Sequence, residues 1–409
     1  MRSFYTWWVI SCVVNVPLIV LNIIGIGNID GSILATANLF TLSLIRNEPF
    51  LNLLYYIVVN STRSISSTGR LKWFKRWIHR LLHFNGDLHL TSAVFLTVWI
   101  ALFIKDRANK FKIEQIVLCS IILGFSFIII LLAQRAFRVR YHNIFEWSHR
   151  YLGWTTLGVF LSFFIVSHYP DKFVEMTYNP AFILFSLSTI IIFSPWFFVR
   201  KIDIRNKIQH FDGGVILTLP GHIKAGSFVR ISLDLNEWHA FGTANRNKDS
   251  QEFDLIIAPA GDWTKRLLTM CQEGNPPEYI YLRTIFSIGF MRSVLSYEKV
   301  LCVGTGGGIA PILSFITHID TENVHILWSA KQFNKHYGAD VTNLMLERSN
   351  TTLLDTSGGR PDLFQIISDK VEKQEIDSVF IVSNQPATYD LVHKLGQVDI
   401  VAYGAVWDS

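Results

Sequence analysis

The sequence has few charged residues and few cysteines for its length. Charged residues make up 17% of the 409 residues and hydrophobic residues make up 50%, whereas a soluble domain usually has about 25% charged residues. This balance argues against a purely soluble protein, and it excludes a disordered chain, a collagen and a coiled coil. The 4 cysteines stand singly and form no CxxC pair, so we expect no disulfide scaffold, zinc site or iron–sulfur cluster.

The apolar residues gather in the first half of the chain, in runs long enough to cross a bilayer. A spanning helix needs about 17 to 25 mostly apolar residues. A shorter run, residues 31–45, is expected either to span or to lie flat, and residues 50–59 are expected to form a helix against the membrane. The first run is interpreted as a retained helix rather than a cleaved signal peptide. The clear runs are residues 8–24, 88–104, 116–132, 152–166 and 181–199.

The distribution of Lys and Arg between the loops predicts the orientation of these helices. With six spans, the basic stretch 63–80, the loop 135–140 and the tail 200–207 all fall on one side. Cytoplasmic loops are enriched in Lys and Arg, so we expect the second half of the chain to be cytoplasmic. The basic loop 105–112 opposes this assignment, although the total favours it. Because the basic residues lie beside apolar runs, the net charge of +5 predicts membrane contact rather than nucleic-acid binding.

Two histidines of the first half are candidate haem ligands. His89 begins the run 88–104, and His149 precedes the run 152–166. These two helices run in the same direction, so both histidines fall at the predicted cytoplasmic end. Neutral imidazole is a common ligand of haem iron, and ionisable residues at membrane depth are costly. One hypothesis is therefore a single b-type haem; the alternative is a pair of interfacial histidines whose polar ring edges reach water.

The second half of the chain changes from alternating β-type runs to strands separated by helices. The alternating runs, punctuated by Gly and Pro, predict a small antiparallel barrel. The later runs predict a parallel sheet with crossover helices. The alternating runs are residues 214–219, 227–233, 252–258 and 278–282, and the later runs are residues 299–303, 324–328 and 378–382. The predicted fold is multi-domain: an α-helical transmembrane bundle of about six helices (1–200), an antiparallel β-barrel (201–297) and an α/β parallel-sheet domain (298–409).

A glycine-rich turn follows the first predicted parallel strand. The stretch Gly304-Thr305-Gly306-Gly307-Gly308 leads through Pro311 to an apolar helix. Glycines there let the backbone approach a pyrophosphate, whose charge the helix N-terminus favours. The spacing differs from the GxGxxG fingerprint, but the position between strand and helix predicts a nicotinamide dinucleotide site. The alternative is a purely structural turn.

Three further stretches together favour a flavin. Residues 238–243 (WHAFGT) supply an aromatic ring and a hydroxyl at the end of a strand. Residues 261–266 (GDWTKR) supply a glycine, a hydroxyl and two cations ahead of a short helix, which suits a pyrophosphate. The C-terminal YGAVWDS places Trp407 close to the chain end. Each stretch alone is compatible with core packing or a surface loop.

These residues resemble the ferric reductase and NADPH oxidase group of membrane flavoproteins, whose cytoplasmic half is similar to ferredoxin–NADP reductases. The resemblance lies in the order of the membrane histidines, HAFGT, GDWTKRL, GTGGGIAP, GRPDL (359–363) and a near-terminal aromatic. HAFGT, EWSHRYLGW (146–154) and YGAVWDS also resemble integral-membrane flavin and nicotinamide proteins of fungi, which are often fused to adenylate-forming synthetases. The resemblance covers nearly the whole chain and implies the cofactors FAD and NADPH, with NADH as an alternative.

The resemblance also implies roles for single residues. Phe241, in the stretch that begins with His239, would lie against the flavin, and Trp407 would cover the flavin until nicotinamide displaces it. Ser383 stands where reductases usually carry a cysteine near the nicotinamide. The FAD pyrophosphate would be held by Gly261, Thr264 and Lys265, and the nicotinamide dinucleotide would be lined by Gly304, Thr305, Gly306, Gly308 and Pro311.

The sequence departs from this group at three places. Positions 102, 103, 162 and 163 hold Leu, Phe, Ser and Phe where a second histidine pair would lie, so no outer haem is expected. Gly242 replaces the Ser or Thr that bonds the flavin N5, and we expect Thr243 or the backbone to make that bond. No acidic residue ends the second parallel strand; Lys331 follows it instead, which favours the 2′-phosphate of NADPH.

Three hypotheses for function remain. The first is a membrane flavoenzyme that passes electrons from NADPH through FAD, and through one haem, to a ferric chelate, a quinone, oxygen or a partner protein. The second is a haem-free reductase whose apolar half is an anchor. The third is a non-catalytic membrane sensor or scaffold that keeps the nucleotide-binding folds.

Overall fold

The computed structural model describes residues 4–67, 69–83, 85–169, 172–244, 251–316 and 323–405. The chain forms two compact units, and it passes between them at residues 50–51, 83–84 and 194–195. The first unit holds residues 1–50 and 84–194, and the second holds residues 51–83 and 195–409. The segment 51–83 therefore belongs to the second unit, whereas the predicted first domain included it.

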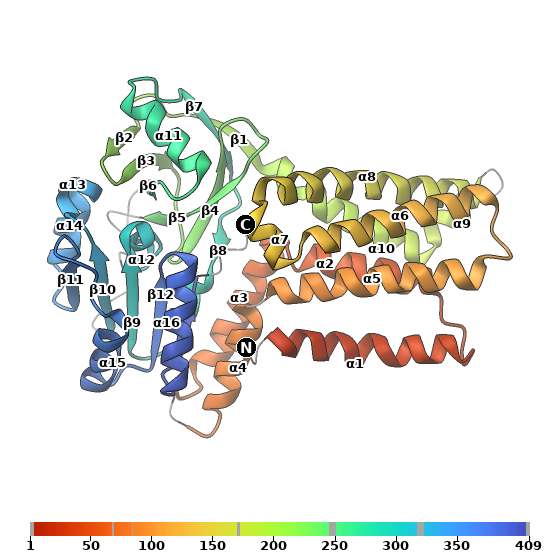
Figure 1. Ribbon diagram of the computed structural model, residues 1–409, viewed down its shortest axis with the longest axis horizontal. Coiled ribbons are helices and arrows are strands. Elements are labelled where there is room, and N and C mark those ends of the chain that lie inside the picture. The colour runs from red at the N-terminus through yellow and green to blue at the C-terminus, as the bar shows by residue number, and fades with distance from the viewer. Residues whose placement is uncertain are drawn as a thin grey trace. The chain divides into compact units, whose positions relative to one another are not determined.

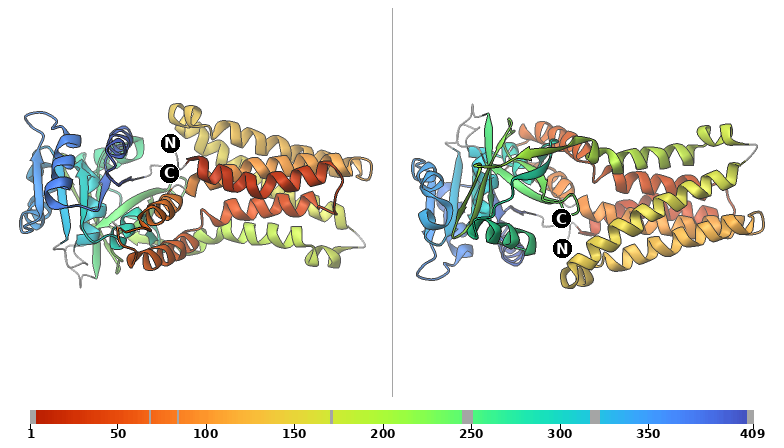
Figure 2. Two further views of the ribbon diagram at one scale, coloured as in Figure 1. Left: turned by 90° about the horizontal axis from the view of Figure 1, so that it is seen from below. Right: turned by 90° about the horizontal axis from the view of Figure 1, so that it is seen from above.

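The first unit is a bundle of apolar helices that run alongside one another (Figures 1 and 2). Among the described residues, 5 helices are long and apolar enough to cross a membrane, which matches the predicted runs. The sixth predicted run forms a shorter apolar helix, α2 (Gly31–Leu44). The long helices are α1 (Phe4–Ile23), α5 (Asn85–Arg107), α6 (Ile113–Leu132), α8 (His142–His168) and α10 (Pro180–Phe193); α7 (Arg135–Arg140) and α9 (Phe173–Tyr178) are short.

A buried polar network joins three helices of this bundle. The Asn15 side-chain oxygen accepts hydrogen bonds from Asn38 Nδ2 at 3.1 Å and from Trp99 Nε1 at 2.9 Å. Ser11 and Thr91 hydroxyls lie 2.8 Å apart. Polar side chains that bond across helices specify helix pairing in an apolar surrounding, where the hydrophobic effect does not distinguish one helix face from another. The network therefore fixes the register of α1, α2 and α5.

The second unit contains a curled antiparallel sheet in the order β1-β7-β4-β5-β6-β3-β2, with β8 paired to β4. Among the described residues, β1 and β2 lie at the two ends of this sheet, which curls into a half-barrel and agrees with the predicted antiparallel barrel. Its core is formed by apolar side chains of alternate strand positions and by α11 (Asp262–Gln272). The strands are β1 (Val199–Asp203), β2 (Ile208–Phe211), β3 (Gly214–Pro220), β4 (Ser227–Ser232), β5 (His239–Ala244), β6 (Glu252–Ile257), β7 (Tyr279–Arg283) and β8 (Ser287–Ile288).

The second unit also contains a parallel sheet of 5 strands in the order β11-β10-β9-β12-β13. Apolar cores lie on both faces, one with α12 and α14 and one with α15 and α16. The strands run outward in both directions from β9, so the topological switch point lies between β9 and β12. The elements are β9 (Val300–Thr305), α12 (Ile309–Ile316), β10 (Val324–Ala330), α13 (Phe333–Tyr337), α14 (Ala339–Leu346), β11 (Thr351–Asp355), α15 (Leu363–Gln374), β12 (Ser378–Val382), α16 (Gln385–Gln397) and β13 (Ala402–Gly404).

Two helices from the segment between the first-unit helices pack within the second unit. These are α4 (Lys72–His83) and most of α3 (Glu48–Arg63). Asn52 on α3 pairs with β8 as a strand would: its Nδ2 donates to the Phe286 carbonyl at 2.9 Å, and its Oδ1 accepts from the Ile288 N–H at 2.7 Å. Residues 50–59, expected to lie as a helix against the membrane, are thus helical and contact this unit.

Candidate functional site

Two predicted site residues meet at the switch point of the parallel sheet. Thr305 ends β9 and Ser383 follows β12, and their hydroxyl oxygens lie 2.6 Å apart. Ser383 is buried, and its carbonyl accepts a hydrogen bond from the Thr388 hydroxyl. In doubly wound sheets, ligands bind at the carboxyl ends of the strands beside this point. The hydroxyl pair therefore marks the candidate nucleotide site.

The glycines beside this pair are required by the packing of the chain itself. A Cβ on Gly308 would overlap the Val382 carbonyl, and one on Gly307 would lie 2.9 Å from the Ala258 Cβ. Gly306 has φ +56°, and its carbonyl accepts a hydrogen bond from the buried Trp328 indole at 3.0 Å. Gly304 is also closely packed, against Ile312. We call residues 306–308 the closed turn.

The closed turn leads into α12, which contacts the antiparallel sheet through Pro311. A Cβ on Gly242 of β5 would lie 2.5 Å from Pro311 Cγ, so this strand position accepts only glycine without movement. This contact explains why the sequence has Gly242 where the related group carries Ser or Thr. It also brings β5, with the predicted flavin residues, against the helix that follows the glycine run.

Thr243 lies on the opposite side of β5 from Gly242. Its side chain is fully buried, and its hydroxyl donates a hydrogen bond to the Ser227 carbonyl at 3.0 Å. Successive strand residues point to opposite faces, so Thr243 does not replace a hydroxyl at position 242. The Thr243 hydroxyl proton is thus engaged inside the sheet, which favours the backbone over Thr243 for the predicted flavin contact.

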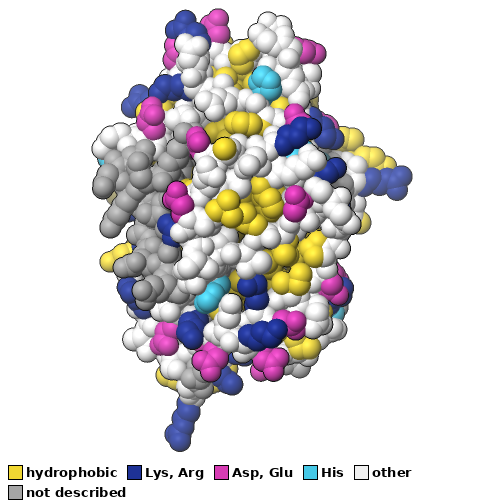
Figure 3. Space-filling model, turned by 90° about the vertical axis from the view of Figure 1, so that its left-hand side faces the viewer, with side chains coloured by type: hydrophobic (Ala, Val, Ile, Leu, Met, Phe, Trp, Pro, Cys, Tyr) yellow, Lys and Arg dark blue, Asp and Glu magenta, His cyan; other side chains and the backbone are white. Residues whose placement is uncertain are grey.

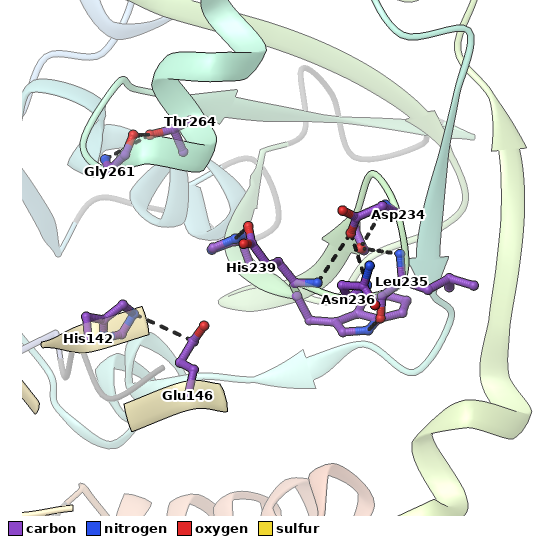
Figure 4. A network of polar contacts seen from close by, with 11 residues as sticks. His142, Glu146, Asp234, Leu235, Asn236, His239, Gly261 and Thr264 are labelled. Carbon is purple, nitrogen blue, oxygen red and sulfur yellow. Dashed lines mark hydrogen bonds and ion pairs between the residues drawn. The ribbon is translucent and has the colours of Figure 1, made fainter. Parts of the chain in front are cut away.

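Three aromatic rings form a stack between β5 and α11. The Trp263 ring lies 4.7 Å from His239 and 5.8 Å from Phe241, centroid to centroid. His239 is half-buried and has Glu237 at 3.7 Å, and the preceding turn is held by the Asp234 carboxylate, which accepts from the Asn236 N–H (Figure 4). Phe241 also packs against the core of the antiparallel sheet. The sequence analysis missed Trp263, whose buried ring holds the two predicted residues in place.

The turn before α11 is built around Thr264, as Figure 4 shows. The Thr264 hydroxyl oxygen accepts hydrogen bonds from the N–H groups of Ala260 and Gly261 and donates to the Gly261 carbonyl. No atom lies within 4 Å of a Cβ placed on Gly261, and the Lys265 side chain is exposed. We call residues 260–264 the open turn. The first-turn N–H groups of α11 and the Lys265 ammonium remain available to an anion there.

Lys331 lies at the carboxyl edge of the parallel sheet, directly after β10. The neighbouring strand β11 brings Asp355 to the same edge, where its carboxylate accepts hydrogen bonds from the Ser357 hydroxyl and N–H. These bonds, with a smaller contribution from Lys331, hold the pKa of Asp355 below its usual value. Sequence reasoning considered only the end of the second strand and so missed this carboxylate, which the topology supplies from the third.

His89 and His149 come together in the first unit. Their ring centroids lie 6.2 Å apart, and His89 Nδ1 lies 2.9 Å from the Leu42 carbonyl. With Nδ1 donating to that carbonyl, the tautomer leaves Nε2 of His89 as a free lone pair. The structure therefore brings the two predicted histidines side by side in the bundle.

The positions of a second histidine pair are occupied by a packed aromatic cluster. The Phe103 and Phe163 rings lie 6.0 Å apart, and Phe111 contacts both. On the same helix as His149, His142 forms an ion pair with Glu146 at 3.6 Å (Figure 4). Trp407, the predicted cover of the flavin, lies outside the described residues.

Comparisons with known proteins agree with the resemblance predicted from the motifs. Residues 290–409 match the family described as adenylate-forming reductase 03009, C-terminal domain. Two adenylate-forming reductases from Coprinopsis cinerea are similar to this chain. One is 28% identical over 92% of the chain, and the other is 29% identical over 91% of it. The chain spans about a third of the length of these relatives, 37% in each case. NADPH oxidase 1 from Rattus norvegicus is 28% identical over 25% of this chain and 20% of its own length.

Solved structures show a looser likeness. A flavohemoglobin from Malassezia yamatoensis with bound FAD and heme covers 93% of this chain and 99% of its own, with a TM-score of 0.42 and 13% identity. Phthalate dioxygenase reductase covers 50% of this chain and 68% of its own, with a TM-score of 0.39 and 10% identity. By sequence, the chain therefore resembles adenylate-forming reductases over most of its length and NADPH oxidase 1 over a quarter of it.

Proposed function

We propose that this chain is a membrane-bound, NAD(P)H-dependent flavin oxidoreductase. The nicotinamide nucleotide would bind across the closed turn, and FAD would bind to the half-barrel. The observation that carries the proposal is the hydroxyl pair of Thr305 and Ser383, 2.6 Å apart at the switch point of the parallel sheet. The similarity to NADPH oxidase 1 supports the same chemistry. In domain terms, we assign FAD to residues 201–297 and NAD(P)H to residues 298–409.

The residues at the switch point would orient the nicotinamide. Ser383 and Thr305 offer hydroxyl donors and acceptors at one place, and the buried surroundings of Ser383 keep its hydroxyl in one orientation. The N-terminus of α12, which follows the closed turn, favours a pyrophosphate. The site would thus bind and position the nucleotide, while the flavin accepts hydride and releases electrons singly when it is bound.

The half-barrel supplies a platform and an anion site for FAD. Phe241, held by Trp263, would contact the flavin ring, and Thr264 shapes the open turn so that α11 N–H groups and Lys265 meet the pyrophosphate. Because Thr243 is buried and bonded to Ser227, we assign the flavin N5 contact to the β5 backbone near Gly242. Trp407 is proposed as the cover of the flavin face.

Electron transfer onward would use one b-type haem between His89 and His149. The ring spacing of 6.2 Å and the Leu42 contact that fixes the His89 tautomer support this assignment. Such a haem would pass single electrons toward an acceptor. The acceptor classes that fit a membrane flavoprotein are a ferric chelate, a quinone, oxygen or a partner protein. We place the second unit on the cytoplasmic side, as the loop charges favour.

Absorption spectroscopy of the detergent-purified chain tests the proposal. Anaerobic NADPH should bleach the flavin absorbance, and a Soret band should shift as sharp α and β bands develop. Flavin bleaching without a Soret band would remove the haem and leave an anchored reductase. Flavin that dithionite bleaches but neither NADPH nor NADH does would contradict an oxidoreductase and favour the sensor or scaffold.

Histidine variants separate the haem assignment from the flavin chemistry. His89→Ala and His149→Ala should each remove the Soret band and leave bleaching by NADPH unchanged. His168→Ala is the matched control, because His168 lies at the other end of α8 from His149 and bonds only its own helix, at the Phe164 carbonyl, among the contacts described. A Soret band that survives both His89→Ala and His149→Ala would assign the haem to other ligands.

A further inference from the structure

Helix α4 buries two ionisable side chains together with Leu81 and Leu82, and it exposes two tryptophans. Lys75 and His79, which lie on one face at i and i+4, are 2% and 1% exposed. Trp73 and Trp77, which lie four residues apart on another face, are 63% and 40% exposed. A helix on a water-facing surface normally buries its aromatic rings and exposes its charges. In the part of the chain that the structure describes, both tryptophan rings stay exposed, so contact with an apolar surrounding would stabilise α4.

The buried polar face of α4 is satisfied by the second unit and holds the helix in this orientation. Lys75 Nζ donates to the Ile65 carbonyl at 2.8 Å and lies 4.5 Å from the Tyr297 ring centroid. The two ring nitrogens of His79 lie 2.8 Å from the Thr62 hydroxyl and 3.1 Å from the Ser293 hydroxyl. Rotating the helix to bury its tryptophans would break all of these contacts. The outward direction of Trp73 and Trp77 is thus fixed.

The outer face of α4 combines aromatic rings with a basic edge. Trp73, Phe74 and Trp77 are exposed, and the Phe74 ring contacts the Trp73 ring in a T-shaped arrangement and the Trp77 ring in a tilted one. Lys72 and Arg80 are also exposed, and the helix Lys72–His83 contains no acidic residue. By contrast, acidic and basic side chains are mixed over the face of the second unit that Figure 3 shows. Tryptophan with Lys and Arg is the composition of helices that lie in the membrane interface.

We propose that α4 is an interfacial helix that binds the second unit to the surface of an anionic lipid bilayer. The aromatic rings would enter the boundary between headgroups and acyl chains, and Lys72 and Arg80 would contact the lipid phosphates and carboxylates. The course of the chain favours a bilayer over a protein partner, because α4 ends at His83 and the apolar helix α5 begins at Asn85. This role is independent of the flavin chemistry proposed above.

Photo-crosslinking in a bilayer tests this contact directly. The full chain, with the photoreactive residue benzoylphenylalanine at one position, is reconstituted in nanodiscs of phosphatidylcholine and phosphatidylserine and irradiated, and lipid adducts are counted by mass spectrometry. Trp73 and Trp77 are the test positions. Phe127 on α6, 55% exposed, is the positive control within an apolar helix, and Leu346 on α14, 62% exposed, is the negative control. We expect lipid adducts at 73, 77 and 127 and none above background at 346.

The basic edge gives a second readout. In the benzoylphenylalanine-77 chain, Lys72→Gln with Arg80→Gln should lower the adduct yield up to about fivefold per charge removed in the anionic nanodiscs. In nanodiscs of phosphatidylcholine alone, the same substitutions should leave the yield unchanged. Equal yields in both lipids with and without the substitutions would overturn the electrostatic part of the proposal.

Three other results would overturn the lipid assignment. Adducts at 127 without adducts at 73 and 77 would show that α4 does not contact lipid. A covalent dimer from 73 or 77 would assign the aromatic face to a second copy of the chain. Equal adduct yields at 77 and 346 would show that lipid does not prefer α4. The absence of lipid adducts at 127 would show that the first unit does not lie in the bilayer, which would also overturn the proposal. None of these results bears on whether NADPH bleaches the flavin, so the two proposals fail separately.

Discussion

The closed turn and the open turn both follow a strand and precede a helix, yet their glycines have opposite surroundings. In the closed turn, a Cβ on Gly308 would overlap the Val382 carbonyl and one on Gly307 would approach Ala258. In the open turn, a Cβ on Gly261 would meet nothing within 4 Å. The packing of the protein explains why Gly307 and Gly308 are glycines, but it does not explain why Gly261 is one. A glycine run is therefore weak support for a ligand until the packing of its glycines is known.

The largest expected difference between the two turns is in the stability lost when one glycine of each is replaced by alanine. Gly308→Ala forces a carbon against a backbone carbonyl that cannot move alone, so we expect a loss of about 3 kcal/mol in the free energy of unfolding. That loss corresponds to a melting temperature lower by about 6 to 12 °C for a unit of this size. Gly261→Ala should change the free energy by no more than about 0.5 kcal/mol. Equal destabilisation by the two variants in a thermal melt would break the contrast.

Acid should destabilise the second unit through the buried side chain of His79. Burial, with Lys75 nearby, lowers the pKa of His79 to about 4, whereas an unfolded histidine has a pKa of about 6.5. Below pH 6.5 the unfolded chain binds a proton that the folded chain refuses, so stability is constant above that pH and falls as the pH approaches 4. We expect a loss of about 2 to 3 kcal/mol across this window. His79→Gln should flatten the dependence, and an unchanged slope in that variant would assign it to other groups.

The hydroxyl pair beside the closed turn should matter for rate more than for stability. Ser383→Ala removes one partner from Thr305 and one contact for the nicotinamide, so hydride transfer to the flavin should slow about tenfold. Stopped-flow bleaching of the flavin with NADPH measures this rate. Ser378→Ala is the matched control, because Ser378 begins the same strand and its hydroxyl has no hydrogen-bond partner among the described residues. Equal rates in the two variants would remove Ser383 from the site.

The smallest effect concerns the choice of nucleotide at the edge of the same sheet. Lys331→Ala should weaken NADPH relative to NADH about three- to fivefold, because an exposed ammonium contributes about 1 kcal/mol to a phosphate contact. Asp355→Asn should favour NADPH by a similar factor, since it removes a negative charge near Lys331. Lys335→Ala, which loses only an ion pair with Asp212, serves as the control. If neither Lys331→Ala nor Asp355→Asn alters the preference for NADPH over NADH, the choice of NADPH is contradicted.

Periodicity predicted the larger elements of the fold well, and short elements poorly. The apolar runs of the first unit and the strands from Gly214 to Val382 were found because their patterns extend over several residues. The strands β8 and β13 have 2 and 3 residues, too few for an alternating pattern to be recognised. The segment 51–83 was placed with the membrane helices because Tyr297 and Ser293, which contact Lys75 and His79, come from a distant part of the sequence.

Site residues that belong to a contiguous sequence motif were predicted. Site residues that act from a neighbouring element of the fold were missed. Thr305 was named from the glycine-rich turn after a strand and Ser383 from the family resemblance, and the sheet order brings them together. The role of Thr243 stays a prediction, and its side chain lies on the opposite face of β5 from Gly242. Trp263 and Asp355 were missed because each acts from an element adjacent in space but not in sequence.

The three crossings between the units also limit how the chain can be divided. A piece that begins at residue 195 would lack α3 and α4, and with them the side chain that completes the hydrogen bonds of β8 and the cation over Tyr297. The reductase-like half is therefore not a detachable module with a single linker. Its segment 51–83 is joined to the apolar half at both ends, so separating the two units requires cutting the chain at three places.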